Sequence, residues 1–188
     1  MSDFLELEYK YKADEIKLDE FKKLMGTLGF KTNLDVSSWD HYYTKEETKD
    51  IFTRFRDSSN NPELTTKIKV NNGNNWERYE YDLPLDPKRV TEPIVSEFVK
   101  THGFINKTSI YKSCFIYWQD NVNYVYYIVY DKNLKELGRY IEVEVNKGKV
   151  KDLTNPIDEL NLAAVPLEKL GITSQNRMKK SLYEIYVK

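Results

Sequence analysis

Charged and apolar side chains alternate strictly along residues 6–12, which read Glu-Leu-Glu-Tyr-Lys-Tyr-Lys. Successive side chains of an extended strand point to opposite faces. One face of this strand therefore carries two acids followed by two bases, and the other carries Leu7, Tyr9 and Tyr11. A strand of this kind needs a polar surface on one side and an apolar core on the other.

One such strand alone is typical of a half-buried sheet whose charged face meets water. Here the pattern returns in four more segments, which are Arg54 and Arg56, then Lys67 and Lys69, then Arg78, Glu80 and Asp82, and finally Glu142 and Glu144. Solvated faces usually mix charges with Ser, Thr, Asn and Gln, whereas these segments place charges at consecutive same-face positions. If the apolar faces pack against helices, the charged faces converge inside a barrel.

Alternation predicts eight strands, near residues 4–12, 38–45, 50–57, 63–70, 76–83, 109–118, 123–130 and 139–147. Helical spacing predicts helices over 16–25 and 92–99, each followed by a Gly-Phe pair, and this repeated order suggests a weak internal duplication. The predicted fold is α+β, an antiparallel eight-stranded closed β-barrel with helices packed on the outside. We expect one domain over residues 1–188.

The charge balance limits the classes of partner. With 29 Lys and Arg against 30 Asp and Glu, the net charge is −1, so the chain lacks the global basic field of non-specific nucleic-acid binders. The single cysteine, Cys114, excludes an internal disulfide and a thiolate metal cluster. The first residues do not resemble a signal peptide and no apolar run reaches the length of a membrane span, so we expect a cytoplasmic protein.

The histidines and the cysteine are not predicted to be catalytic. We interpret His41 as a surface or packed residue, His102 as a helix C-terminal cap and Cys114 as a small buried residue.

Motifs in order along the chain resemble those of the CYTH, or triphosphate tunnel metalloenzyme, superfamily. Residues 6–10 match its Glu-x-Glu-x-Lys signature, and residues 40–44 resemble its Asp-x-Tyr-Tyr-Asp segment. Further similar segments are Arg-x-Arg at 54–56, Thr-x-Lys at 65–67, Arg-x-Glu-x-Asp at 78–82, Leu-Gly-x-Tyr-x-Glu-x-Glu at 137–144, Leu-Gly at 170–171 and Lys-Ser-x-Tyr at 180–183. The first motif alone would be weak, but the ordered set spans essentially the whole chain.

The resemblance implies a Mg²⁺ or Mn²⁺ cofactor and a triphosphate substrate inside a tunnel. The implied metal ligands are Glu6, Glu8, Glu80, Glu142 and Glu144, and the implied catalytic residues are Glu6, Glu8 and Lys10. The implied substrate-binding residues are Lys10, Lys12, Arg54, Arg56, Lys67, Lys69, Arg78 and Lys180. Carboxylates together with phosphate oxygens suit either metal, and clustered cations neutralise phosphates.

One segment departs from the family pattern. After its second Gly-Phe the family usually carries Lys-x-Arg, whereas this chain reads Ile-Asn-Lys-Thr-Ser-Ile-Tyr-Lys over residues 105–112. Either Lys107 or Lys112 can supply the missing charge, and the sequence leaves both open.

The leading hypothesis is a metal-dependent triphosphatase acting on inorganic tripolyphosphate or on a small organic triphosphate. The alternatives are a class IV adenylate cyclase, an RNA 5′-triphosphatase and a non-catalytic binder of polyphosphate or a nucleotide. An RNA substrate calls for a basic surface outside the tunnel, which no lysine block clearly supplies, so nucleic acid is expected only as an RNA 5′ end. A pure anion receptor gains nothing from the paired acids. We expect a monomer or homodimer without a membrane partner.

Overall fold

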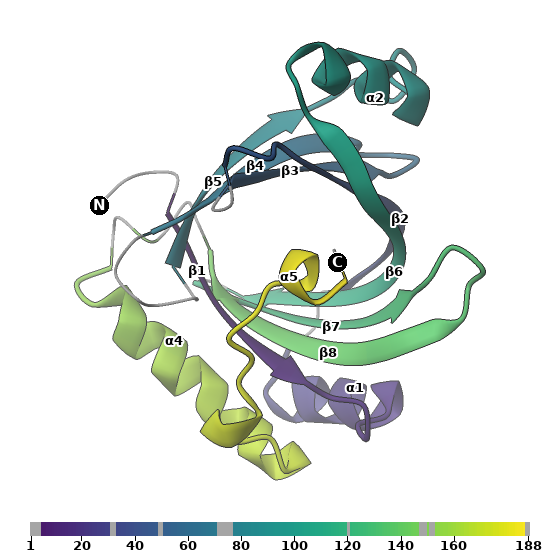
Figure 1. Ribbon diagram of the computed structural model, residues 1–188. Coiled ribbons are helices and arrows are strands. Elements are labelled where there is room, and N and C mark those ends of the chain that lie inside the picture. The colour runs from purple at the N-terminus through teal and green to yellow at the C-terminus, as the bar shows by residue number, and fades with distance from the viewer. Residues whose placement is uncertain are drawn as a thin grey trace.

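Eight antiparallel strands close into a barrel in the computed structural model, which describes residues 5–30, 33–48, 51–70, 77–119, 121–146, 150 and 153–186 (Figure 1). The strands are β1 (Leu5–Lys12), β2 (Asn33–Thr44), β3 (Ile51–Asp57), β4 (Glu63–Lys69), β5 (Glu77–Pro84), β6 (Ile105–Gln119), β7 (Val122–Tyr130) and β8 (Glu136–Val145). Their order around the ring is β1, β5, β4, β3, β2, β6, β7, β8. The predicted α+β fold with an eight-stranded closed barrel is confirmed.

Two strands are longer than the sequence indicated. β2 begins at Asn33 and β6 at Ile105, not near residues 38 and 109. They pair from Asn33 opposite Tyr117 to Thr44 opposite Ile105, with one register shift after Tyr42. These added ends lack the charged alternation on which the prediction relied, and their pairing with each other makes them strands.

The largest apolar core lies outside the barrel, as predicted. Leu7, Tyr9 and Tyr11 form the outward face of β1 and belong to one buried cluster with Phe21 and Leu160. Phe21 comes from α1 (Leu18–Thr27) and Leu160 from α4 (Pro156–Ala164). Because these helices cover the apolar faces of the strands, the charged faces are left to the interior.

A second helix-covered region lies on the opposite side of the ring. There α2 (Glu92–Thr101) places Val95 and Val99 against Tyr43 of β2 and Phe55 of β3 (Figure 1). α1 and α2 are both followed by a glycine with positive φ, +84° at Gly29 and +82° at Gly103, a backbone conformation that favours glycine.

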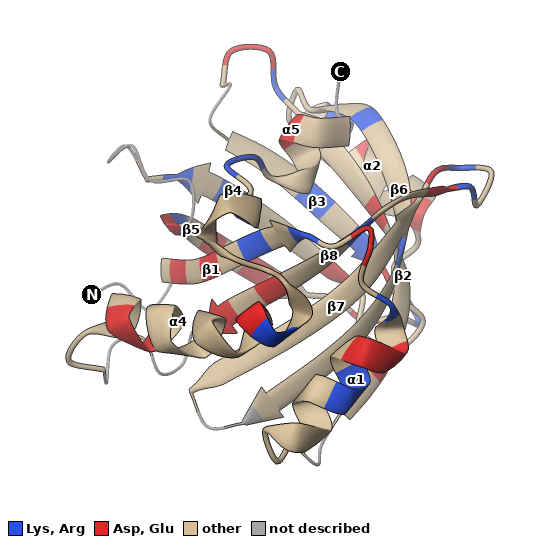
Figure 2. Cartoon of the chain, turned by 90° about the horizontal axis from the view of Figure 1, so that it is seen from below, with Lys and Arg blue, Asp and Glu red and all other residues tan. Residues whose placement is uncertain are grey.

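The chain after β8 was not predicted to be helical. It forms α4, two 3₁₀ helices (Val165–Leu170 and Ser174–Asn176) and α5 (Leu182–Tyr186). α5 lies at one end of the barrel (Figures 1 and 2). Its Leu182 joins a buried cluster with Tyr42 and Phe52, and the Tyr183 ring stacks on Phe52 with centroids 4.6 Å apart. Apolar side chains therefore fill this end.

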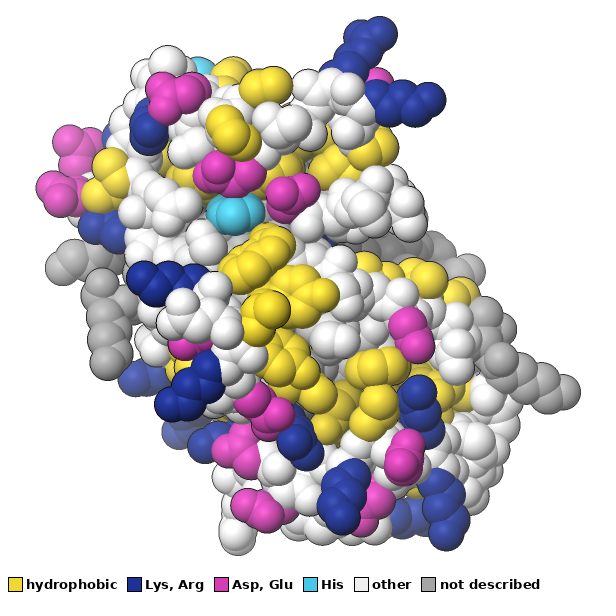
Figure 3. All heavy atoms as spheres, turned by 90° about the vertical axis from the view of Figure 1, so that its right-hand side faces the viewer, with side chains coloured by type: hydrophobic (Ala, Val, Ile, Leu, Met, Phe, Trp, Pro, Cys, Tyr) yellow, Lys and Arg dark blue, Asp and Glu magenta, His cyan; other side chains and the backbone are white. Residues whose placement is uncertain are grey.

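Part of the outer face of β2 and β6 carries linked aromatic rings. Trp39 contacts Tyr111 with ring centroids 5.4 Å apart, and Tyr111 contacts Tyr130 at 5.9 Å. His41 lies on the same outer face, stacked between Trp39 and Phe55, with Nδ1 2.9 Å from Ser109 Oγ. Hydrophobic side chains gather in a band on this side of the molecule (Figure 3). In the described part of the chain, no helix is long and apolar enough to cross a membrane.

The packing of α4 gives a stability prediction with an internal control. Leu160 is fully buried between α4 and the barrel, whereas Leu162 on the same helix is 67% exposed. We expect Leu160→Ala to lower the free energy of unfolding by about 3 kcal/mol, because it leaves a cavity in the core. Leu162→Ala should change it by less than about 0.5 kcal/mol. Urea denaturation measures both, and equal effects would show that α4 is not packed on the barrel.

Candidate functional site

The barrel encloses a cavity of about 310 Å³. Its basic lining residues are Lys10, Arg54, Arg56, Lys67, Arg78 and Lys112, and its acidic ones are Glu6, Glu8, Glu63, Glu80, Asp82, Glu142 and Glu144. They come from the inward faces of β1, β3, β4, β5, β6 and β8, and Figure 2 shows charged residues along the barrel strands. The strand alternation thus gathers charges of both signs around one space.

Two lysines tie the acids of β1 to neighbouring strands. Lys67 Nζ donates to both carboxylate oxygens of Glu6, at 3.0 and 2.9 Å, and also pairs with Glu80. Lys10 Nζ lies 3.0 Å from Glu8 Oε1 and 2.9 Å from Glu142 Oε1. Buried charges are tolerated when paired in this way.

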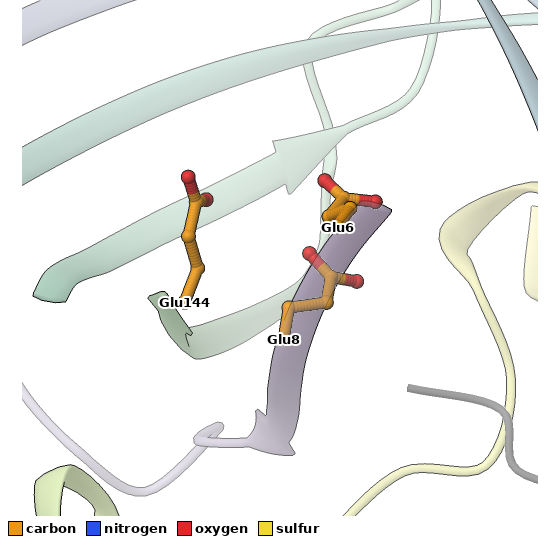
Figure 4. Close-up of side chains that lie close together, drawn as sticks. All are labelled: Glu6, Glu8 and Glu144. Carbon is orange, nitrogen blue, oxygen red and sulfur yellow. The ribbon is translucent and has the colours of Figure 1, made fainter. Parts of the chain in front are cut away.

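Glu6, Glu8 and Glu144 form a group that can hold a metal ion. One carboxylate oxygen from each lies within 4.8 Å of the others, as β1 and β8 place these side chains together (Figure 4). Asn123 Nδ2 donates to Glu144 Oε1 at 3.1 Å, which helps to orient that carboxylate. Three converging carboxylates are a donor set suited to Mg²⁺ or Mn²⁺.

The environment separates the pKa values of these three acids. Burial raises the pKa of Glu144 to about 7, and the nearby Glu8 and Glu142 add to the effect. Burial also raises the pKa of Glu6 well above its usual value, although Lys67 opposes it. Burial alone would raise the pKa of Glu8, but Lys10, Lys67 and Arg78 outweigh it and lower that pKa to about 2.

A second group of charges, centred on Asp40, comes from β2, β3 and β6. Asp40 is fully buried and accepts hydrogen bonds from Arg56 Nε at 3.0 Å and Arg56 Nη2 at 3.4 Å. Lys112 Nζ lies 2.8 Å from Asp40 Oδ2, the oxygen that Arg56 Nη2 also contacts. These two cations hold the pKa of Asp40 well below its usual range despite burial, so Asp40 stays ionised and fixes both cations at the cavity wall.

Arg54 lies beside this group with part of its guanidinium unused. Its Nη2 donates to Thr65 Oγ1 at 3.0 Å and to Glu63 Oε1 at 3.3 Å. Its Nε is buried and has no hydrogen-bond partner within the described segments. A buried donor without a partner is unfavourable.

Comparison with known proteins identifies the fold. No protein-family model matches the chain, and no curated protein matches its sequence. The solved structure of PH1012 from Pyrococcus horikoshii OT3 matches with a TM-score of 0.74 at 21% identity, covering 97% of this chain and 98% of that one. A "putative adenylate cyclase" from Vibrio parahaemolyticus gives 0.67 at 11% identity, covering 96% and 97%, and one from Bacillus halodurans gives 0.63 at 12%, covering 98% and 100%. The chain has the fold of these solved structures.

Most of the predicted site residues line the tunnel. These are Glu6, Glu8, Lys10, Arg54, Arg56, Lys67, Arg78, Glu80, Glu142 and Glu144. Their placement together follows from the barrel, and their roles as metal ligands, substrate contacts or catalytic groups stay predictions.

Three predicted substrate-binding lysines lie outside the tunnel lining. Lys12 is 61% exposed and pairs with Asp14, and Lys69 pairs with Glu184 of α5. Lys180 is exposed and borders a much smaller cleft behind Glu8. Lys12 and Lys69 lie outside the lining because both are the last residues of their strands, beyond the charged centre of the barrel. In addition, α5 fills the barrel end that Lys69 faces.

The two candidate lysines of residues 105–112, the segment that departs from the family pattern, lie in different places. Lys112 lines the tunnel, whereas Lys107 is exposed. Cys114, two residues beyond Lys112 on the same inward face of β6, also lines the tunnel. The inward face of β6 therefore passes from a cation to a small uncharged side chain.

Other lining residues were not among the predicted site residues. The alternation placed Asp82 on a charged strand face with Arg78 and Glu80 but it was given no role, and Glu63 shares the inward face of β4 with Lys67, so the same alternation could have found it. Ser181, Leu182 and Tyr183 line the tunnel from the C-terminal segment, and only the position of α5 reveals this.

The raised pKa of Glu144 gives a pH prediction for the metal-free protein. Between about pH 4.5 and 7 the native state keeps a proton that the unfolded state has lost, so this group makes stability fall as pH rises. Glu144 contributes at most about 1.4 kcal/mol per pH unit to the slope of the free energy of unfolding against pH. We expect Glu144→Gln to remove it, as measured by urea unfolding from pH 5 to 8 in chelator. Glu168→Gln, at an exposed position, is the control, and an unchanged profile in Glu144→Gln would contradict the assignment.

Proposed function

We propose that this chain is a divalent-metal-dependent triphosphatase that removes the terminal phosphate of a triphosphate substrate bound in the tunnel. The observation that carries the proposal is the division of the tunnel lining into two groups. Glu6, Glu8 and Glu144 converge on one side, and Arg54, Arg56 and Lys112 gather on β3 and β6. A triphosphate and a metal ion together need both groups.

The chemistry of the acidic group fits a divalent cation. Without one, burial and the neighbouring carboxylates raise the pKa values of Glu6 and Glu144, because ionised carboxylates placed this close together in a buried site are unfavourable. Glu6, Glu8 and Glu144 would hold Mg²⁺ or Mn²⁺ through hard oxygen ligands, and Glu80 and Glu142 lie beside them. When bound, the metal would neutralise phosphate charge and lower the pKa of a coordinated water.

The basic residues fit the phosphate chain. Arg56 and Lys112 are held at the wall by Asp40, and Arg54 keeps a buried Nε donor without a partner in the described residues. Guanidinium groups bind two phosphate oxygens at once, so these residues would bind and orient the substrate before reaction.

Hydrolysis then requires little covalent chemistry from the protein. The oxygen of water bonds to the terminal phosphorus, the bridging P–O bond breaks, and orthophosphate, a diphosphate product and a proton are released. Glu8, kept ionised by Lys10, would orient the attacking water, and the cations would stabilise the charge that develops on the leaving oxygen.

A second candidate is an adenylate cyclase, which the names of the Vibrio and Bacillus structures favour. In that reaction the ribose 3′-oxygen of ATP bonds to the α-phosphorus and pyrophosphate leaves. The same two groups of residues would serve, so only the products separate the candidates.

Product analysis tests the proposal. The protein is incubated with Mg²⁺ or Mn²⁺ and, in parallel, tripolyphosphate, thiamine triphosphate and ATP, and orthophosphate, pyrophosphate and cyclic AMP are resolved. We expect orthophosphate, lost on chelation. Cyclic AMP with pyrophosphate would establish the cyclase, and binding without any product would establish a non-catalytic receptor. A triphosphorylated RNA oligonucleotide in the same assay tests the alternative hypothesis of an RNA 5′-triphosphatase.

Variants of the acidic group connect activity to metal. We expect Glu6→Gln with Glu8→Gln to reduce turnover by roughly a hundredfold or more, because metal catalysis supplies several kcal/mol of transition-state stabilisation. Mn²⁺ titration followed by electron paramagnetic resonance should show weaker binding in this variant and in Glu144→Gln. Glu63→Gln, which lines the tunnel outside the acidic group, is the matched control for metal affinity. Full activity of the double variant would contradict the proposal.

A further inference from the structure

One wall of the tunnel carries almost no charge. β7 has no charged residue at all (Figure 2), and its inward-facing Val125 lies opposite Ile116 of β6. Next to Ile116 on the same inward face is Cys114. Charge resumes on β6 at Lys112, four residues before Ile116 and roughly 13 Å away along the strand, and on β8 at Glu142, which pairs with Val125.

The apolar surface continues onto β2 and toward the barrel end away from α5. Val36 pairs with Cys114 and Leu34 with Ile116, and directly paired residues share a face, so both side chains extend the same surface. Tyr42, which contacts the α5 region, lies eight residues further along β2. We call Leu34, Val36, Cys114, Ile116 and Val125 the apolar wall.

The two halves of these strands differ in what covers them. Near α5, Ile110 and Val129 are 2% and 0% exposed and belong to the cluster that contains Leu182. Farther along, Ile116 and Val125 are only half-buried and Leu34 is 46% exposed. Cys114 and Val125 are partly buried against that cluster, whereas Leu34, Val36 and Ile116 belong to none of the apolar clusters formed by the described residues.

An uncovered apolar surface beside a charged tunnel is unfavourable unless a ligand covers it. A bare polyphosphate would not, because all of its outer atoms are charged or polar oxygens. We propose that the apolar wall binds the organic group of the substrate, and hence that the chain acts on an organic triphosphate whose esterified group is flat or apolar, in preference to inorganic tripolyphosphate. This inference rests on the proposed triphosphatase function.

The position of the wall fits that substrate. Lys112 and Arg56 bind Asp40 at the inner end of the wall, so a phosphate chain held there leads directly onto Cys114 and Ile116. Cys114 lies between Lys112 and Ile116 on the same inward face and extends the uncharged surface up to the cation. Leu34, Ile116 and Cys114 are therefore specificity-determining residues.

The test is a ratio of kcat/KM values, with Mn²⁺, for thiamine triphosphate or ATP against tripolyphosphate. We expect the wild-type protein to prefer an organic substrate. Leu34→Ser and Ile116→Ser should lower that ratio about tenfold with little change for tripolyphosphate, since lost apolar contacts affect only the organic group. Cys114→Arg should shift the ratio in the same direction by improving tripolyphosphate binding. Leu162→Ser, equally apolar but on the exposed face of α4, should leave the ratio unchanged.

The outcomes separate this inference from the proposed function. Hydrolysis of none of the three triphosphates would overturn both. If tripolyphosphate is hydrolysed best and all variants keep the wild-type ratio, the triphosphatase function stands and the substrate class is wrong. Leu34 is at an exposed rim, so its variant remains informative if Ile116→Ser does not fold.

Discussion

Pairing of buried cations with buried carboxylates is the interaction on which the rest of this structure depends. Lys67 with Glu6, Lys10 with Glu8 and Glu142, and Asp40 with Arg56 and Lys112 let a barrel hold charges of both signs on its inside. Each pair repays part of the desolvation of its members, and removal of one partner typically costs about 3–5 kcal/mol because the other is left buried and alone. The interior can therefore be polar and still be ordered before any ligand binds.

A charged interior forces the apolar side chains outward, and this determines where the helices lie. The outward face of β1 is buried by α1 and α4, and Tyr43 and Phe55 are buried by α2. The ordinary arrangement of a small barrel, with its core inside, is thereby inverted. Among the described residues, the substantial apolar packing inside the barrel is at the α5 end, where Leu182 meets Tyr42 and Phe52.

Period-two alternation predicted the inward faces well because it depends only on the backbone geometry of a strand. Glu6, Arg54 and Glu142 were placed correctly on that basis. Alternation says nothing of how far along a strand the tunnel extends, so Lys12 and Lys69 were included although they lie at strand ends and pair with other acids. α5 was missed because five residues are too few to show helical periodicity, and Asp40 was not selected because its same-face neighbours, Ser38 and Tyr42, carry no charge.

The position of the organic group on the apolar wall bears on which phosphorus reacts. The acidic group on β1 and β8 marks where a metal would lie, and Arg54, Arg56 and Lys112 would position a phosphate chain relative to it. The remaining variable is how deeply the esterified end of the substrate enters the tunnel. A group held at the rim by Leu34 and Ile116 would keep the ester end outermost. The acids are not simply farther in, however, because Val125 of the apolar wall pairs with Glu142 and the neighbouring Asn123 pairs with Glu144. The depth of the esterified end would therefore determine whether the terminal or the α-phosphorus reaches the acids. The products made from ATP report that depth, because orthophosphate marks attack at the terminal phosphorus and cyclic AMP marks attack at the α-phosphorus.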